Sequence, residues 1–157
     1  MQANRTLYLA IALISFAVIG AALYLQHVEM MAPCPYCVMQ RYAFLVLGIF
    51  ALLGASGNAG LRKAGGVLAL LAGLTGAGIA IRHIWIQAHP GLSCGIDPLE
   101  TSLNKIPTAT LLPSVFKADG LCTQVHELFG LSIPTWSLLA FAVLSVALAW
   151  LLRKRAR

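Results

Sequence analysis

The sequence predicts an all-α integral membrane protein: a bundle of four transmembrane helices with two cysteine-bearing loops on one side of the bilayer. Of its 157 residues, 59% are hydrophobic and only 10% are charged, a balance far from that of an average soluble domain. Four uncharged apolar stretches each approach the length that a helix needs to cross the hydrocarbon layer. All four cysteines lie between these stretches rather than inside them.

The first span is expected over residues 7–26. No residue between Arg5 and Glu29 is charged, and the stretch supplies the roughly 20 apolar residues that a crossing helix requires. A cleaved signal peptide would instead carry an apolar core of about 7–15 residues followed by small residues at a cleavage site. We therefore expect a retained membrane anchor.

The other spans follow from the same pattern. The second is expected over residues 41–57, and basic residues follow it at positions 62 and 63. The third is expected over 65–82, where glycine and alanine are frequent and would let transmembrane helices pack closely. The fourth is expected over 135–152, because Pro134 fits the first turn of a helix and basic residues follow at the end.

The segments 27–40 and 83–133 remain as the two loops, and the basic residues orient them. Seven of the eleven basic residues, and none of the acidic ones, lie at the N-terminus, between the second and third spans, and in the C-terminal tail. The positive-inside rule places these segments, with both termini, in the cytoplasm. In a bacterial inner membrane both loops are then periplasmic. The +6 charge is explained by this orientation, and it forms no basic patch with interleaved aromatics that would indicate nucleic acid binding.

The first loop carries a Cys-Pro-Tyr-Cys motif at Cys34 and Cys37. A C-x-x-C pair is suited to thiol–disulfide exchange, because a helix N-terminus or a nearby cation can stabilise its thiolate. If a helix begins near Pro35, Arg41 lies on the same helical face as Cys37, four residues further on. Cys94 and Cys122 form a second, widely spaced pair in the other loop.

Together these features resemble the DsbB family of disulfide bond formation proteins, and the resemblance covers all four spans and both loops. Its local motifs are Gln26-His27-Val28, Pro33-Cys34-x-x-Cys37-x-x-x-Arg41, and Val115-Phe116 through Cys122 to Phe129-Gly130-Leu131 with Pro134 and Trp136. The Pro-Tyr centre of the first motif departs from the best-known members.

The resemblance implies a protein-dithiol:quinone oxidoreductase that reoxidises a periplasmic thiol oxidase of the DsbA type and passes the electrons to a membrane quinone, ubiquinone or menaquinone. By this resemblance, Cys94 forms the mixed disulfide with the partner and Cys122 is its companion. Cys34 receives electrons from the loop and Cys37 faces the quinone. Arg41 is required for quinone use.

His83, near the outer end of the third span, is a further candidate for hydrogen bonding to the quinone. His89 and His126 are expected to be solvated loop residues. Two alternatives from other classes remain open: disulfides with a purely structural role, and a four-cysteine metal site. Structural zinc sites usually combine two closely spaced C-x-x-C units, and only one is present here, so no metal ligands are assigned.

Overall fold

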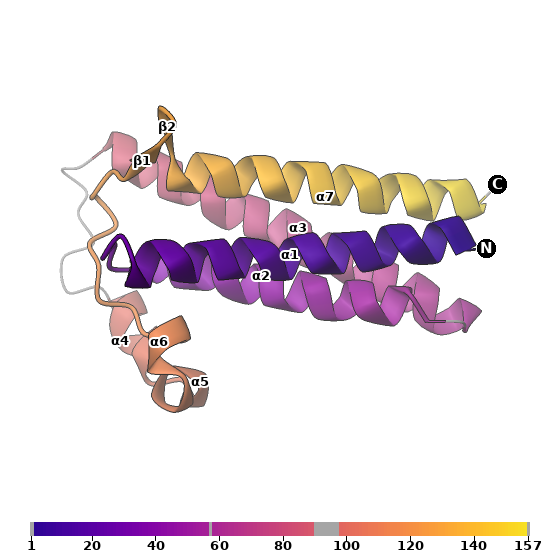
Figure 1. Ribbon diagram of the computed structural model, residues 1–157, viewed down its shortest axis with the longest axis horizontal. Coiled ribbons are helices and arrows are strands. Elements are labelled where there is room, and N and C mark those ends of the chain that lie inside the picture. Colours follow the sequence, from indigo (N-terminus) through magenta and orange to yellow (C-terminus); the bar gives the residue numbers. More distant parts are fainter. Residues whose placement is uncertain (1, 57, 90–97, 157) are drawn as a thin grey trace.

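A computed structural model describes residues 2–56, 58–89 and 98–156 and confirms the predicted four-helix bundle. All four long helices are long and apolar enough to cross a membrane. Both termini lie at one end of the bundle (Figure 1). Of the described cysteines, Cys34 and Cys122 belong to segments that join the helices at the other end, and Cys37 belongs to the first turn of the helix that follows Cys34. The long helices are α1 (Gln2–His27), α2 (Pro35–Gly54), α3 (Ala59–Ala88) and α7 (Ile133–Ala156).

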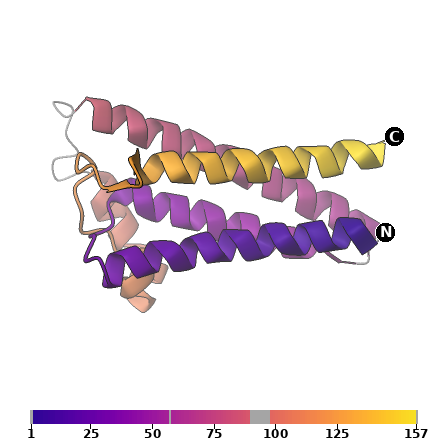
Figure 2. The ribbon, with the colours of Figure 1, turned by 45° about the horizontal axis from the view of Figure 1, so that its top comes forward.

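The helices pack in the order α1, α2, α3, α7, and α1 makes few contacts with α7 (Figure 2). The core between them is aromatic and aliphatic, and the rings of Phe44 and Phe141 stack with their centroids 3.8 Å apart. Leu13 and Val146 lie on the outside, with 70% and 69% of their surface exposed. Large apolar side chains on the outer surface are what a lipid-facing bundle requires.

Two glycines of α3 show why that helix needs small residues. A Cβ atom on Gly65 would lie 2.5 Å from the backbone nitrogen of Gly54, and one on Gly76 would lie 2.3 Å from the ring of Phe141. Larger residues would force α3 away from α2 and α7. The close packing expected from the glycine-rich third stretch is therefore present at these positions.

Three of the helices extend beyond both ends of the predicted spans, whereas α2 begins before its span and ends at Gly54, short of the expected residue 57. α2 begins at Pro35 because proline suits the first helical turn and the side chain of Cys34 caps the helix. α3 begins after Asn58, whose side-chain oxygen accepts a hydrogen bond from the Gly60 amide at 2.9 Å. Helical hydrogen bonding also continues past residue 82. His83 is consequently part of α3, whereas the sequence placed it at the start of the second loop.

Three short helices, α4 (Pro98–Asn104), α5 (Pro107–Leu111) and α6 (Pro113–Phe116), lie beside the outer ends of α1 and α2 (Figure 1). Tyr42 of α2 holds them in place, because its ring stacks on Phe116 at 4.4 Å and its hydroxyl hydrogen-bonds to Thr108. The loop thus rests on the bundle near the cysteine motif.

A small antiparallel hairpin, β1 (Glu127–Leu128) and β2 (Leu131–Ser132), leads into α7. Its two turn residues, Phe129 and Gly130, both have positive φ, the conformation of a tight hairpin turn. The Trp136 indole donates a hydrogen bond to the Leu128 carbonyl at 2.9 Å, which ties the hairpin to α7.

Candidate functional site

The two cysteines of the motif lie at the N-terminus of α2. The Cys37 amide donates a hydrogen bond to Cys34 Sγ at 3.3 Å, so the first cysteine caps the helix that carries the second. Their sulfur atoms are 2.9 Å apart. Because a disulfide bond is about 2.05 Å long, a shortening of about 0.9 Å would join them. The pair is therefore positioned for reversible oxidation.

Cys122 and His83 complete a buried cluster around Cys34. Cys122 packs with Cys34 and Ile86 and is almost fully buried. His83 Nε2 lies 3.5 Å from Cys34 Sγ, and its ring stacks on Tyr36. The structure thus brings together residues from the first loop, the third helix and the second loop.

In the reduced protein, the surroundings of Cys34 favour the protonated thiol. Hydrogen bonds with the side chains of Cys122 and Cys37, followed by burial, raise the pKa of the Cys34 thiol above its usual range. A sulfur with a raised pKa is a poor leaving group in disulfide exchange. The chemical roles of the two motif cysteines are therefore unequal.

Cys122 is held near Cys34 by backbone hydrogen bonds just before it in the chain. The amides of Asp119 and Gly120 both donate to the carbonyl of Pro33, at 3.1 and 3.0 Å. A Cβ atom on Gly120 would lie 2.3 Å from the Ala32 carbonyl oxygen, so only glycine allows this approach. We call residues 117–122 the strap.

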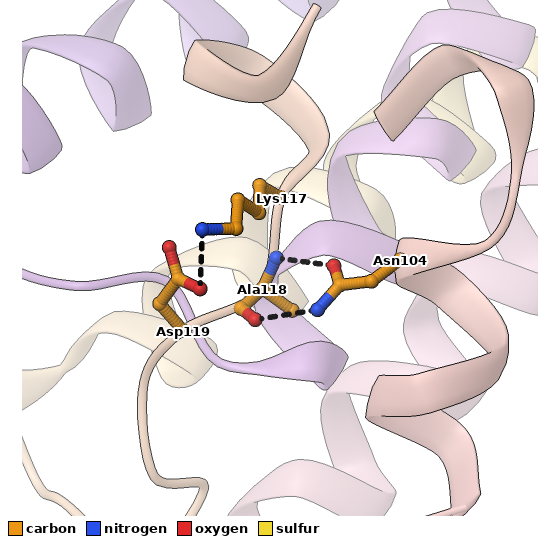
Figure 3. A network of polar contacts seen from close by, with 4 residues as sticks. All are labelled: Asn104, Lys117, Ala118 and Asp119. Carbon is orange, nitrogen blue, oxygen red and sulfur yellow. Dashed lines mark hydrogen bonds and ion pairs between the residues drawn. The ribbon is translucent and has the colours of Figure 1, made fainter. Parts of the chain in front are cut away.

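The strap is also fixed from α4 (Figure 3). Asn104 accepts a hydrogen bond from the Ala118 amide at 2.9 Å and donates one to the Ala118 carbonyl at 3.0 Å. Lys117 and Asp119 form an exposed ion pair at 3.3 Å beside this contact. An exposed ion pair contributes little to stability, so the hydrogen bonds to Asn104 and to the Pro33 carbonyl are what hold the strap in place.

Arg41 is buried and makes hydrogen bonds to neutral oxygens from two other elements. Its Nη1 donates to the Gln26 side chain at 2.6 Å and to the Val115 carbonyl at 2.7 Å, and its Nη2 donates to the Ala22 carbonyl at 3.4 Å. Arg41 therefore joins α1, α2 and α6. Its Nε is buried and has no partner among the described residues.

Two cavities lie near these residues. A cavity of about 20 Å³ is bounded by Cys34, Cys37, His83 and His126, among others. A groove of about 390 Å³ runs between α2 and α3, lined by Met39, Tyr42, Ala43, Val46, Ala72, Thr75 and Ile79. Since these α2 residues lie on the opposite helical face from Cys37, the groove does not open onto the sulfur pair.

One residue of the buried cluster was not identified from the sequence. Gln40, which approaches His83 Nδ1 at 3.4 Å, lies one helical turn from Tyr36 on the same face of α2, and that spacing is the only hint of it. His126 lies in a loop but is half-buried rather than fully solvated: its Nε2 is buried, with no partner among the described residues. His89 is exposed, as expected, and stacks on Trp85. Cys94 lies outside the described residues.

Comparison with known proteins shows that the chain is similar to disulfide bond formation proteins. Residues 4–151 match the family described as "Disulfide bond formation protein DsbB". The chain is 52% identical over 149 residues to Disulfide bond formation protein B of Herminiimonas arsenicoxydans, with 94% of each chain covered. It is 48% identical over 151 residues to the protein of that name from Cupriavidus metallidurans, covering 95% of this chain and 93% of that one. For Ralstonia nicotianae the identity is 46% over 159 residues, covering 100% and 99%.

Proposed function

The chain belongs to the DsbB family of disulfide bond formation proteins, and from this premise we propose that it oxidises the dithiol of a soluble DsbA-type oxidase and delivers the two electrons to a membrane quinone. One observation carries the proposal. Cys122, from the outer loop, is packed against Cys34, which caps the helix that carries Cys37. This juxtaposition would let a disulfide in a loop exchange with a disulfide at the bundle.

The proposed exchange conserves thiols and disulfides at each step. A thiolate of the partner attacks Cys94 of a Cys94–Cys122 disulfide, forming a mixed disulfide and releasing the thiolate of Cys122. The Cys122 thiolate attacks Cys34 of the Cys34–Cys37 disulfide, and Cys37 leaves as a thiolate. The partner's second thiol then resolves the mixed disulfide, and the freed Cys94 attacks Cys122 and releases Cys34. The partner has lost two electrons and two protons, and Cys34 and Cys37 now hold them as a dithiol.

Two features of the described chain fit a quinone next to this dithiol. Cys37 is partly exposed at the outer end of α2, and the buried Arg41 Nε–H, one turn further on, has no acceptor among the described residues. Cys37 would meet the quinone ring, and Arg41 would face a carbonyl oxygen. When bound, a quinone supplies a lipid-soluble acceptor for two electrons and two protons. The fixed charge of Arg41 favours negative charge at this boundary.

We also propose a bacterial inner-membrane location with both termini in the cytoplasm and the cysteines in the periplasm. Arg5, Arg62 and the basic tail of α7 belong to the end of the bundle that carries the termini (Figure 1). The thiol cluster is at the opposite end. The positive-inside rule supports this orientation, and an oxidising compartment suits the cysteines.

The test is a coupled assay with purified protein in detergent. Reduced DsbA-type oxidase and a soluble ubiquinone analogue are mixed with the protein, and quinone absorbance is followed beside the redox state of the partner. We expect one quinone reduced per partner oxidised, and no steady turnover in Cys37→Ser. If the folded wild-type protein catalyses neither change with ubiquinone or menaquinone analogues, the proposal fails and purely structural disulfides become the better explanation.

A further inference from the structure

The reduced thiol cluster has the donor set of a soft-metal site. Cys34 Sγ, Cys37 Sγ and one ring nitrogen of His83 all lie within 4.8 Å of one another. We propose that the reduced protein binds one Zn²⁺ ion through Cys34, Cys37 and His83, and that formation of the Cys34–Cys37 disulfide abolishes this site. The proposal does not depend on the partner or on the electron acceptor proposed above.

The distances suit a tetrahedral ion. Zinc bonds of about 2.3 Å to sulfur and about 2.0 Å to nitrogen place those two ligand atoms about 3.5 Å apart. Cys34 Sγ and His83 Nε2 are 3.5 Å apart. Two zinc-bound sulfurs lie about 3.8 Å apart, so the 2.9 Å separation of the cysteine sulfurs must widen by about 0.9 Å. A small side-chain rotation of the partly exposed Cys37 would achieve this.

The space between the ligands is also of the right size. The cavity beside the three ligands measures about 20 Å³, enough for a single water molecule or ion. His126 borders the same cavity, and its buried Nε2 has no partner among the described residues. A site with three protein ligands normally adds a fourth from water or a nearby side chain. His126, or a water molecule held by it, would supply that ligand here.

The histidine is already held in place for this role. Its ring stacks on Tyr36 with centroids 5.8 Å apart, and its Nδ1 lies 3.4 Å from the Gln40 side-chain amide. A metal at Nε2 requires the proton on Nδ1. The amide of Gln40, which is 4% exposed, would then turn its oxygen toward that proton. Because these contacts already fix the ring, His83 would lose little conformational entropy on binding the ion.

The chemistry makes the site dependent on redox state. Zn²⁺ binds thiolates, so uptake by the reduced cluster releases two protons from the two thiols. In the oxidised protein these sulfurs are joined to one another and no thiolate remains. A bound ion would in turn prevent the pair from closing into a disulfide. Zinc therefore stabilises the reduced form and opposes its oxidation.

The experiment measures metal binding on untagged protein in detergent. The Cys94→Ser, Cys122→Ser double variant leaves only the thiols of Cys34 and Cys37. One sample is reduced with a phosphine that is then removed, and the other is kept oxidised. Both are titrated with Co²⁺, whose thiolate charge-transfer bands report sulfur ligation, and the bound Co²⁺ is then displaced with Zn²⁺. We expect one ion per reduced chain and none with these bands in the oxidised chain.

Ligand variants separate this site from adventitious binding. His83→Gln should weaken Zn²⁺ binding at least tenfold, whereas His89→Gln, the matched control on the exposed histidine that follows the last residue of the same helix, should not. Equal affinity in the two variants would overturn the proposal, as would equal uptake by oxidised and reduced protein. If His83→Gln does not fold, the comparison of the two redox states decides alone. Partner and quinone are absent, so failure of the proposed function would leave these outcomes unchanged.

Discussion

Replacing Gly120 by alanine should separate Cys122 from Cys34. The added Cβ would meet the Ala32 carbonyl oxygen at 2.3 Å, whereas ordinary contact begins near 3.4 Å. The strap must therefore retreat by roughly 1 Å. That movement weakens both hydrogen bonds to the Pro33 carbonyl, a loss of about 1–3 kcal/mol if each contributes about 0.5–1.5 kcal/mol.

The measurable quantity is the effective concentration of Cys34 and Cys122 for one another. It is obtained from the equilibrium of their disulfide with glutathione, in a protein with Cys37 and Cys94 both changed to serine. Since each 1.4 kcal/mol corresponds to a factor of ten, we expect Gly120→Ala to lower this concentration by about 5–150-fold. A displacement of about 1 Å near reacting groups has a comparable effect on rates.

Two controls make the result specific. Gly78→Ala should leave the effective concentration unchanged, because a Cβ on Gly78 meets nothing within 4 Å. The Cys34–Cys37 equilibrium, measured without the loop cysteines, should not respond to Gly120→Ala. If Gly120→Ala folds and its effective concentration stays within about twofold of the parent, the strap does not position Cys122, and the reasoning from the Pro33 contacts is refuted.

Other predictions follow from the same contacts. Arg41→Met should lower Tm, because it removes a buried charged donor from the acceptors on α1 and α6. The same substitution should raise the quinone concentration needed for turnover by about an order of magnitude. A single oxidation of the partner in the absence of quinone should survive. Equal losses in the quinone titration and in the single-turnover assay would mean that Arg41 serves only the fold. Cys122→Ser should accumulate a mixed disulfide between Cys94 and the partner on non-reducing gels, and accumulation in Cys94→Ser instead would reverse their roles. In the reduced protein Cys34 should be alkylated more slowly than Cys37 in a mass-spectrometric time course, because it is buried and its pKa is raised. A cysteine replacing Asn58 should resist an impermeant thiol reagent on intact cells, and labelling there would invert the proposed topology.

The bundle could be predicted from the sequence because each span is a local property of composition. The start of α2 was predicted less well: the span was expected from residue 41, and a helix start near Pro35 entered only as a condition, whereas α2 begins at Pro35. What the sequence could not show are contacts between distant segments. Gly120 looks like any loop glycine until the Ala32 carbonyl is placed beside it, and the neutral partners of Arg41 come from two other elements.

His83 shows how a boundary error changes the interpretation of a site. Apolar composition predicts where a helix leaves the hydrocarbon layer, but α3 continues to Ala88, since backbone hydrogen bonding does not stop at the lipid boundary. This continuation is what buries His83 against Cys34. From the sequence we expected His83 to hydrogen-bond a quinone. The structure places His83 beside the thiol of Cys34.

The unequal chemistry of the motif cysteines gives the proposed exchange its direction. A thiolate of Cys122 could attack either sulfur of the Cys34–Cys37 disulfide. Attack on Cys37 would expel Cys34, which is buried, so its departing thiolate would be poorly solvated and Cys34 is the poorer leaving group. Attack on Cys34 expels Cys37 instead, and the packing of Cys122 against Cys34 favours the same sulfur. Geometry and leaving-group ability therefore select one product, a Cys34–Cys122 link with the Cys37 thiolate released next to Arg41, at the boundary where the proposed acceptor would meet it.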